Sequence, residues 1–136
     1  MADFHIASKR RFVVHLADPG TVTVADDQDL FTIPFLLGKL IGGTFAVLAN
    51  GSSSGGTEAT IERHRAGSSV NMLGTSQIIA HDSSVNHLEF GGEDIVSNGD
   101  QEVEQGDQVG LNIDAIPGGS DSTWATMTLV FQIIKE

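Results

Sequence analysis

The chain has 136 residues and a formal net charge of −11, with 18 Asp and Glu residues against 7 Lys and Arg residues and no cysteine. This length suits one domain with one core and is too short for two-domain enzymes or α/β-hydrolases. The lack of cysteine excludes disulfide frameworks, thiolate metal sites and cysteine nucleophiles. The acidic balance argues against nucleic acid as a partner, because phosphate contacts require cations.

The N-terminal region, residues 1–18, is predicted to be an arm ahead of the folded domain. It carries three cations directly before the first apolar run: Lys9, Arg10 and Arg11. These cations either dock on an acidic partner surface or keep a frayed end soluble. The region lacks the apolar segment of an export signal, and the longest uncharged apolar stretch, 30–38, is too short to span a bilayer. We therefore expect a soluble chain and no membrane partner.

Short runs rich in β-branched and aromatic residues, separated by turn residues, predict strands along the rest of the chain. In chain order these are 12–16, 30–33, 40–49, 57–65, 70–73, 78–80, 85–90, 109–115 and 123–134. Pro34 predicts a strand end, and Gly42-Gly43 predicts a bulge or a close backbone approach. A helix over 58–64 is the alternative for one run, but so short a helix is marginal.

The resulting fold prediction is all-β. About eight antiparallel strands, with residues 19–136 as the folded domain, are typical of a single β-sandwich of jelly-roll type. No repeat with a fixed period is visible that would indicate a solenoid or a propeller.

One motif resembles a catalytic signature. Residues 51–55 match G-x-S-x-G, but they lie in a serine-glycine tract followed by a predicted strand. A nucleophile elbow requires a helix there, so a hairpin loop is the favoured interpretation. We expect a protein that is not an enzyme and has no cofactor.

Metal-ligating residues occur in three places. His81 and His87 could surround a metal with Asp94, although strand-edge histidines are the commoner case. Acidic residues gather at 26–29 and 93–107, where calcium could bind. Neither segment has the spacing of an EF-hand, so solvated loops and no metal are the prediction.

Trp124 is the only tryptophan and begins the last predicted strand. We expect it to pack in the core or in a subunit interface. With the basic residues above, it completes the candidate partner-binding set: Lys9, Arg10, Arg11 and Trp124.

Several segments share an order with a known family. An apolar strand at 40–47 and a strand at 56–61 precede Gly-Asp and alternating apolar residues at 106–116, a Pro-Gly-Gly turn and a closing strand at 127–131. This order resembles small β-sandwich proteins encoded among the structural genes of tailed bacteriophages. The resemblance covers residues 30–134.

The resemblance implies a jelly-roll protein of a phage particle that commonly forms trimers. It implies a capsid decoration, or cement, protein on the exterior of the virion, assembled in the host bacterial cytoplasm. Its partners would be the major capsid protein and other copies of itself. A fibre or tail module, or a lectin-like module that binds a host-surface carbohydrate, is the alternative. The aromatic share of 6% and the lack of tyrosine argue against the lectin. A cupin-type enzyme would need clustered histidines with a glutamate, and no such spacing is present.

Overall fold

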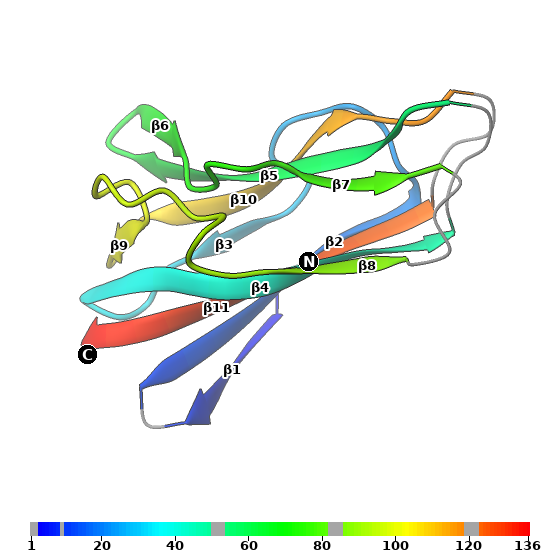
Figure 1. Cartoon of the computed structure of the whole chain (residues 1–136). Coiled ribbons are helices and arrows are strands. Elements are labelled where there is room, and N and C mark those ends of the chain that lie inside the picture. Colours follow the sequence, from blue (N-terminus) through cyan, green and yellow to red (C-terminus); the bar gives the residue numbers. More distant parts are fainter. Residues whose placement is uncertain (1–2, 9, 50–53, 82–85, 119–122) are drawn as a thin grey trace.

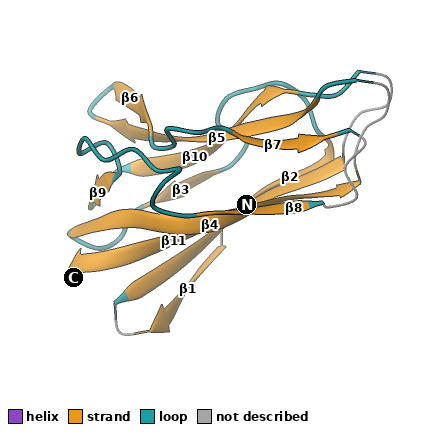
Figure 2. Cartoon of the chain, in the orientation of Figure 1, coloured by secondary structure: helices purple, strands orange, loops and turns teal. Residues whose placement is uncertain are grey.

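Two antiparallel β-sheets pack face to face in the computed structural model, which describes residues 3–8, 10–49, 54–81, 86–118 and 123–136 (Figure 1). These residues form eleven strands. Figure 2 shows that strands and loops make up the described chain, without a helix. The predicted all-β sandwich is confirmed. The predicted number of about eight strands was too low.

The first sheet has six strands in the order β1-β2-β11-β4-β8, and β9 also pairs with β4. Their bounds are β1 (Asp3–Ser8), β2 (Arg11–Thr21), β4 (Leu37–Ala49), β8 (His87–Phe90), β9 (Glu102–Glu104) and β11 (Thr123–Lys135). The second sheet has five strands in the order β3-β10-β5-β6, and β7 also pairs with β5. Its strands are β3 (Leu30–Thr32), β5 (Gly56–Arg65), β6 (Ser68–Asn71), β7 (Gln77–Ala80) and β10 (Gln108–Ala115).

The strand pairs are nested in the sequence. The outermost pair is β2 with β11, followed by β3 with β10, β4 with β8 and β9, and β5 with β6 and β7. The chain from β2 to β11 therefore runs as one long hairpin whose tip lies between β5 and β6. Contacts of β11 with β4 and of β10 with β5 fold this hairpin into two sheets.

One hydrophobic core lies between the sheets. Alternate residues of β2, β10 and β11 face it, as the period of two in a strand requires. Phe35 joins the sheets at one end, where its ring packs edge-on against Phe12, with centroids 5.2 Å apart, and lies 6.3 Å from Phe131. The inward alternation predicted for Val109, Leu111 and Ile113 is confirmed, since all three are buried.

The predicted boundary of the N-terminal arm is wrong. Residues 11–18 belong to β2, which lies between β1 and β11, and Phe12, Val14 and Leu16 are core residues. Residues 3–8 also form a strand, β1, at the edge of the first sheet. The segment is therefore part of the sandwich, because the side chains of β2 complete the core.

Three local predictions are confirmed. Residues 56–65 form strand β5 rather than a helix, and β3 ends at Thr32, before Pro34. In β4, the pairing with β11 shifts between Leu40 and Gly42, which marks the predicted bulge. Glu102–Glu104 is a strand that the sequence did not reveal, because Val103 is its only apolar residue.

Candidate functional site

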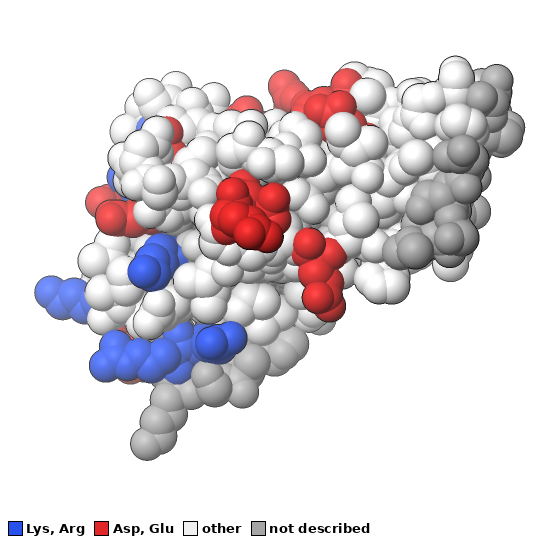
Figure 3. Space-filling view, in the orientation of Figure 1, with Lys and Arg blue, Asp and Glu red and all other residues white. Residues whose placement is uncertain are grey.

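Four cations gather at one end of the first sheet, and we call them the basic end: Arg10, Arg11, Lys39 and Lys135. Two acids lie beside them, since Glu102 pairs with Lys39 and Glu136 lines the same hollow as Arg10 and Lys135. Gln132 of β11 pairs with Arg11 on one side and with Lys39 on the other, which places both cations on one face of the sheet. The carbonyl of Arg10 accepts a hydrogen bond from the N–H of Ile133 at 2.6 Å. Figure 3 shows Lys and Arg side chains together at the lower left, with most visible Asp and Glu side chains above and to the right.

The basic end contains two of the predicted partner-binding residues. Arg10 and Arg11 are exposed at the start of β2. Lys9 lies outside the described residues. Lys39 and Lys135 are more than 25 residues from Arg11 in the sequence, so only the sheet pairing reveals that they belong to the same cluster. The cluster holds four of the seven Lys and Arg residues in a chain of net charge −11.

On the outer face of the first sheet, three rows of paired residues in the central strands β2, β11 and β4 contain no Lys, Arg, Asp or Glu, and the middle row continues to Asp3 of β1 and Glu89 of β8. The rows are Val13–Val130–Gly42, His15–Thr128–Thr44 and Ala17–Thr126–Ala46. His15 Nδ1 lies 3.1 Å from Thr128 Oγ1. Beyond the last row, Leu48 is 71% exposed. The rows consist largely of small residues and threonines, and Val13 is already buried within the chain, so Leu48 provides an exposed apolar side chain at the end of this part of the face.

Trp124 does not pack in the core of the single chain, so that part of the prediction is wrong. Its side chain is 48% exposed, and its backbone has a φ of 55°. Trp124 lies between Thr123 and Ala125, which pair with Ala49 and Val47 of β4, at a register shift between β11 and β2. A positive φ is unusual for a bulky residue and fits this irregular position.

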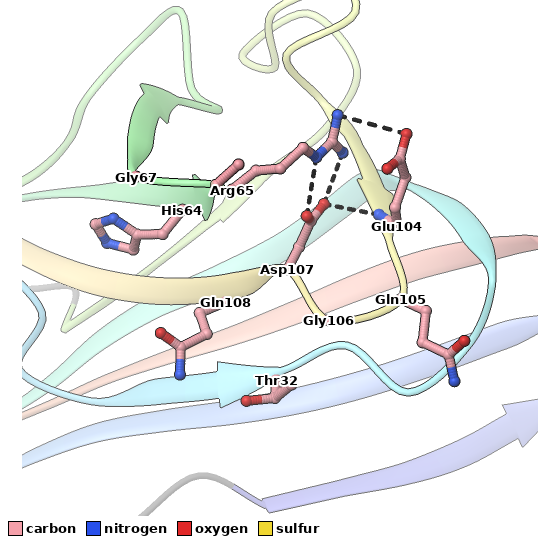
Figure 4. A pocket seen from close by; sticks show the side chains of 10 residues that line it. Thr32, His64, Arg65, Gly67, Glu104, Gln105, Gly106, Asp107 and Gln108 are labelled. Carbon is pink, nitrogen blue, oxygen red and sulfur yellow. Dashed lines mark hydrogen bonds and ion pairs between the residues drawn. The ribbon is translucent and has the colours of Figure 1, made fainter.

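An ion pair closes one end of the second sheet. Arg65, the last residue of β5, donates from Nε to Asp107 Oδ1 at 2.9 Å and from Nη2 to Oδ2 at 2.6 Å (Figure 4). Asp107 Oδ2 also accepts the N–H of Glu104 at 2.7 Å. A hollow of about 500 Å³ lies beside the pair and is lined mainly by polar residues, including Thr32, His64 and Gln108. Ligand pockets are usually mostly apolar, so this hollow does not resemble one.

The surroundings of Asp107 favour its ionised form. Burial opposes ionisation, but hydrogen bonds from Arg65 and from the N–H of Glu104, with the charges of Arg65 and Arg63, hold the pKa of Asp107 below its ordinary value. Arg63 is itself buried, and its Nη1 donates to the carbonyls of Asp100 at 3.2 Å and Glu102 at 2.6 Å. The acidic segment 93–107 is thus not simply solvated, because arginines of β5 hold its C-terminal part.

Asp18 has a buried carboxyl group with an unpartnered oxygen. The residue is 7% exposed, and its Oδ2 has no hydrogen-bond partner. Burial raises the pKa of Asp18 above its ordinary value, and a hydrogen bond from the backbone of Thr23 offsets this only in part. Because the folded state prefers the neutral carboxyl, ionisation of Asp18 opposes folding at neutral pH.

Asp18→Asn is therefore expected to raise the free energy of unfolding at neutral pH by about 1 kcal/mol, since it removes a buried charge while keeping the shape. The difference from the wild type should shrink on acidification and vanish below the ordinary aspartate pKa of about 3.9, where both side chains are neutral. Urea unfolding at neutral and at acidic pH measures this. A difference that is the same at both pH values would contradict the assignment to Asp18.

Within the described part of the chain, one group of three metal-ligating side chains converges: Asp27, Glu62 and His64. The alternative group of His81, His87 and Asp94 is not brought together. His81 Nδ1 lies 2.9 Å from the carbonyl of Gly55, and Asp94 accepts the N–H of Gly91 at 3.3 Å.

The G-x-S-x-G motif lies only partly within the described residues, which exclude residues 51–53. Ser54 and Gly55 lead directly into β5, a strand, whereas a nucleophile elbow needs a helix after the serine. The described end of the motif is therefore followed by the strand that the sequence predicted.

No protein-family model, curated protein or solved structure matches this chain. In the residues that the structure describes, no helix is long and apolar enough to cross a membrane.

Proposed function

We propose that this chain is a non-enzymatic structural protein of a tailed-bacteriophage particle, a capsid decoration protein bound to the exterior of the head. The observation that carries the proposal is the basic end, where four of seven cations gather on a molecule of net charge −11. Such a patch fits an acidic partner surface and orients the molecule on it. The resemblance of residues 30–134 to phage structural proteins indicates that the partner surface belongs to a tailed-bacteriophage particle.

The strand order supports a jelly roll. In our interpretation the two halves are β2-β11-β4-β8 and β3-β10-β5-β6, with β1 as an added edge strand. A jelly roll has two four-stranded sheets formed from Greek keys, and a rolled long hairpin produces this nesting. The fold alone does not specify a function, so we infer the function from the surface of the molecule.

The outer face of the first sheet is the proposed surface for self-association into a homotrimer. Its three rows in β2, β11 and β4 would be covered by a second copy, together with exposed Leu48 and Trp124. The row of Arg11, Gln132 and Lys39 borders these rows on the same face, and in this proposal the basic end extends beyond the covered part to contact the major capsid protein. A protein that binds the assembled shell and not its separated subunits stabilises the shell by mass action.

The variant Arg10→Gln/Arg11→Gln is expected to reduce affinity for undecorated capsids of the encoding phage by about tenfold or more. It removes two charges from the proposed contact, and about 1.4 kcal/mol corresponds to a tenfold change. Cosedimentation with the capsids measures the loss. Wild-type binding should also weaken as salt rises, since salt screens exposed charges.

A matched control changes the net charge equally at another place. In Asn71→Asp/Asn98→Asp both side-chain oxygens can still accept their backbone N–H groups, from Leu73 and Asp100. This variant should bind capsids like the wild type, and light scattering should give a mass near three chains for both variants. Equal binding by the Arg10→Gln/Arg11→Gln variant would refute the basic end as the anchor.

A carbohydrate-binding fibre or tail module is the second candidate, and the exposure of Trp124 favours it. An exposed tryptophan beside loops can stack on a sugar ring. A saccharide array separates the two functions, because a decoration protein should bind capsids and no glycan.

A further inference from the structure

Three metal-ligating side chains meet on the outer face of the second sheet. Glu62 and His64 alternate with buried Ile61 and Arg63 along β5, so both project outward, and Asp27 comes from the loop before β3. His64 Nε2 lies 2.7 Å from Asp27 Oδ1 and 3.4 Å from Glu62 Oε1. The three donor atoms all lie within 4.8 Å of one another. Their side chains are 28%, 32% and 25% exposed for His64, Asp27 and Glu62, so water can reach them.

A buried amide holds both carboxylate residues in place. Asn112 of β10 is 4% exposed. Its Oδ1 accepts the N–H of Asp27 at 2.8 Å, and its Nδ2 donates to Glu62 Oε2 at 3.2 Å, which leaves Oε1 on the side of His64. Hydrogen bonds of this kind to the residues that supply ligands are a usual feature of metal sites, because they orient the donor atoms.

The strand beneath the cluster, β10, has a glycine where the Asp27 carboxylate lies against it. Gly110 pairs with Glu62, and a Cβ atom at Gly110 would lie 2.6 Å from Asp27 Oδ1. The Asp27 carboxylate therefore rests directly over β10. Asp27 itself has a φ of 54°, a left-handed conformation that Asp tolerates better than most residues. The loop is thus folded so that this carboxylate reaches His64.

The donor spacing suits a small divalent cation. Tetrahedral ligands with bonds of about 2.1 Å lie about 3.4 Å apart, and the Nε2–Oε1 distance is already 3.4 Å. The Nε2–Oδ1 pair, now at hydrogen-bond distance, needs to open by less than about 1 Å. Two carboxylates side by side on an acidic chain repel each other, and a cation removes that repulsion.

We propose that Asp27, Glu62 and His64 bind a first-row transition-metal cation such as Zn²⁺, with water in the remaining position. The imidazole nitrogen selects this class over Ca²⁺ and Mg²⁺, which prefer oxygen ligands alone. The ion ties the loop before β3 to the middle of the second sheet. This role is independent of capsid binding, since the basic end lies on the other sheet.

The test uses tag-free protein treated with EDTA and titrated calorimetrically with ZnCl₂, with CaCl₂ as the comparison. We expect one Zn²⁺ per chain, and at zinc concentrations about 100 times Kd a rise in melting temperature of about 5–10 °C. Co²⁺ should give the visible absorption bands of a four-coordinate site. Ca²⁺ should give neither uptake nor a shift.

His64→Gln should weaken Zn²⁺ binding at least about tenfold, as loss of a ligand does. His87→Gln is the matched control, because His87 is exposed on β8 of the other sheet, and it should bind like the wild type. Asp27→Asn is a second variant, whose amide can still accept from His64, and it should also weaken binding. Circular dichroism checks that each variant folds. Wild-type protein without saturable Zn²⁺ uptake, or uptake unchanged in both site variants, overturns the proposal.

Discussion

Gly43→Ala is expected to lower the free energy of unfolding by about 3 kcal/mol, the upper part of the range for overpacking a well-packed interior. Gly43 lies in β4 and pairs with Leu129 of β11 on one side and with Phe90 of β8 on the other. A Cβ atom there would clash with the carbonyl oxygen of Thr128 and approach Phe90 Cζ to 2.5 Å. Because strands flank β4 on both sides, its backbone cannot shift without breaking hydrogen bonds.

Gly92→Ala is the control for this prediction. A Cβ atom at Gly92 meets no heavy atom within 4 Å, so the substitution should change stability by no more than about 0.5 kcal/mol. Urea unfolding followed by far-ultraviolet circular dichroism compares the two variants with the wild type. If Gly43→Ala unfolded at the wild-type urea concentration, the close packing of β4 against Phe90 would be wrong.

The sandwich could be predicted because its central strands alternate. Val109, Leu111 and Ile113 occupy every second position and are all buried, so one face of β10 identifies the core. The Gly42-Gly43 pair also predicted the irregularity in β4. These features depend on neighbours in the sequence, which is why local patterns revealed them.

The N-terminal boundary and the short strand β9 could not be read in this way. Residues 102–104 contain one apolar residue, Val103, and become a strand only because β4 offers an edge with which to pair. Residues 12–16 were predicted as a strand but were assigned to an arm that ends at residue 18. Their place in the sheet depends on β11, more than 100 residues later.

The candidate sites show the same limit. Alternation along the predicted strand 57–65 is enough to put Glu62 and His64 on one face, but Asp27 reaches them only through a loop held by Asn112, 85 residues away. The basic end likewise needs the pairing of Gln132 with both Arg11 and Lys39. Long-range pairing decides these groupings, and one sequence does not display it.

Asp107→Asn is expected to lower the free energy of unfolding at neutral pH by about 2–3 kcal/mol. The aspartate is 3% exposed and holds Arg65 through two hydrogen bonds. Breaking a buried ion pair leaves an uncompensated charge and costs about 3–5 kcal/mol. The side chain of Arg65 is 35% exposed and can be hydrated when Asp107 is lost, so we expect a cost below that of a fully buried pair.

The pH dependence of this loss gives the sharper test. Because the pKa of Asp107 is lowered in the folded state, its ionised form stabilises the protein above the ordinary aspartate pKa of about 3.9. That contribution is lost as the pH falls through the lower pKa of the folded state. The difference between wild type and Asp107→Asn should therefore be full at neutral pH and shrink below about pH 4.

Glu104→Gln separates Asp107 from the second carboxylate near Arg65. The Glu104 side chain is 56% exposed and its Oε1 lies 3.5 Å from Arg65 Nη1, so its loss should change stability by less than about 1 kcal/mol. At neutral pH the change in the free energy of unfolding caused by Asp18→Asn has the opposite sign to that caused by Asp107→Asn. Both changes vanish in acid. Two results would show that the ionised carboxylate of Asp107 does not hold this end of the sandwich. One is a loss of stability in Glu104→Gln as large as that in Asp107→Asn. The other is a loss of stability in Asp107→Asn that persists in acid.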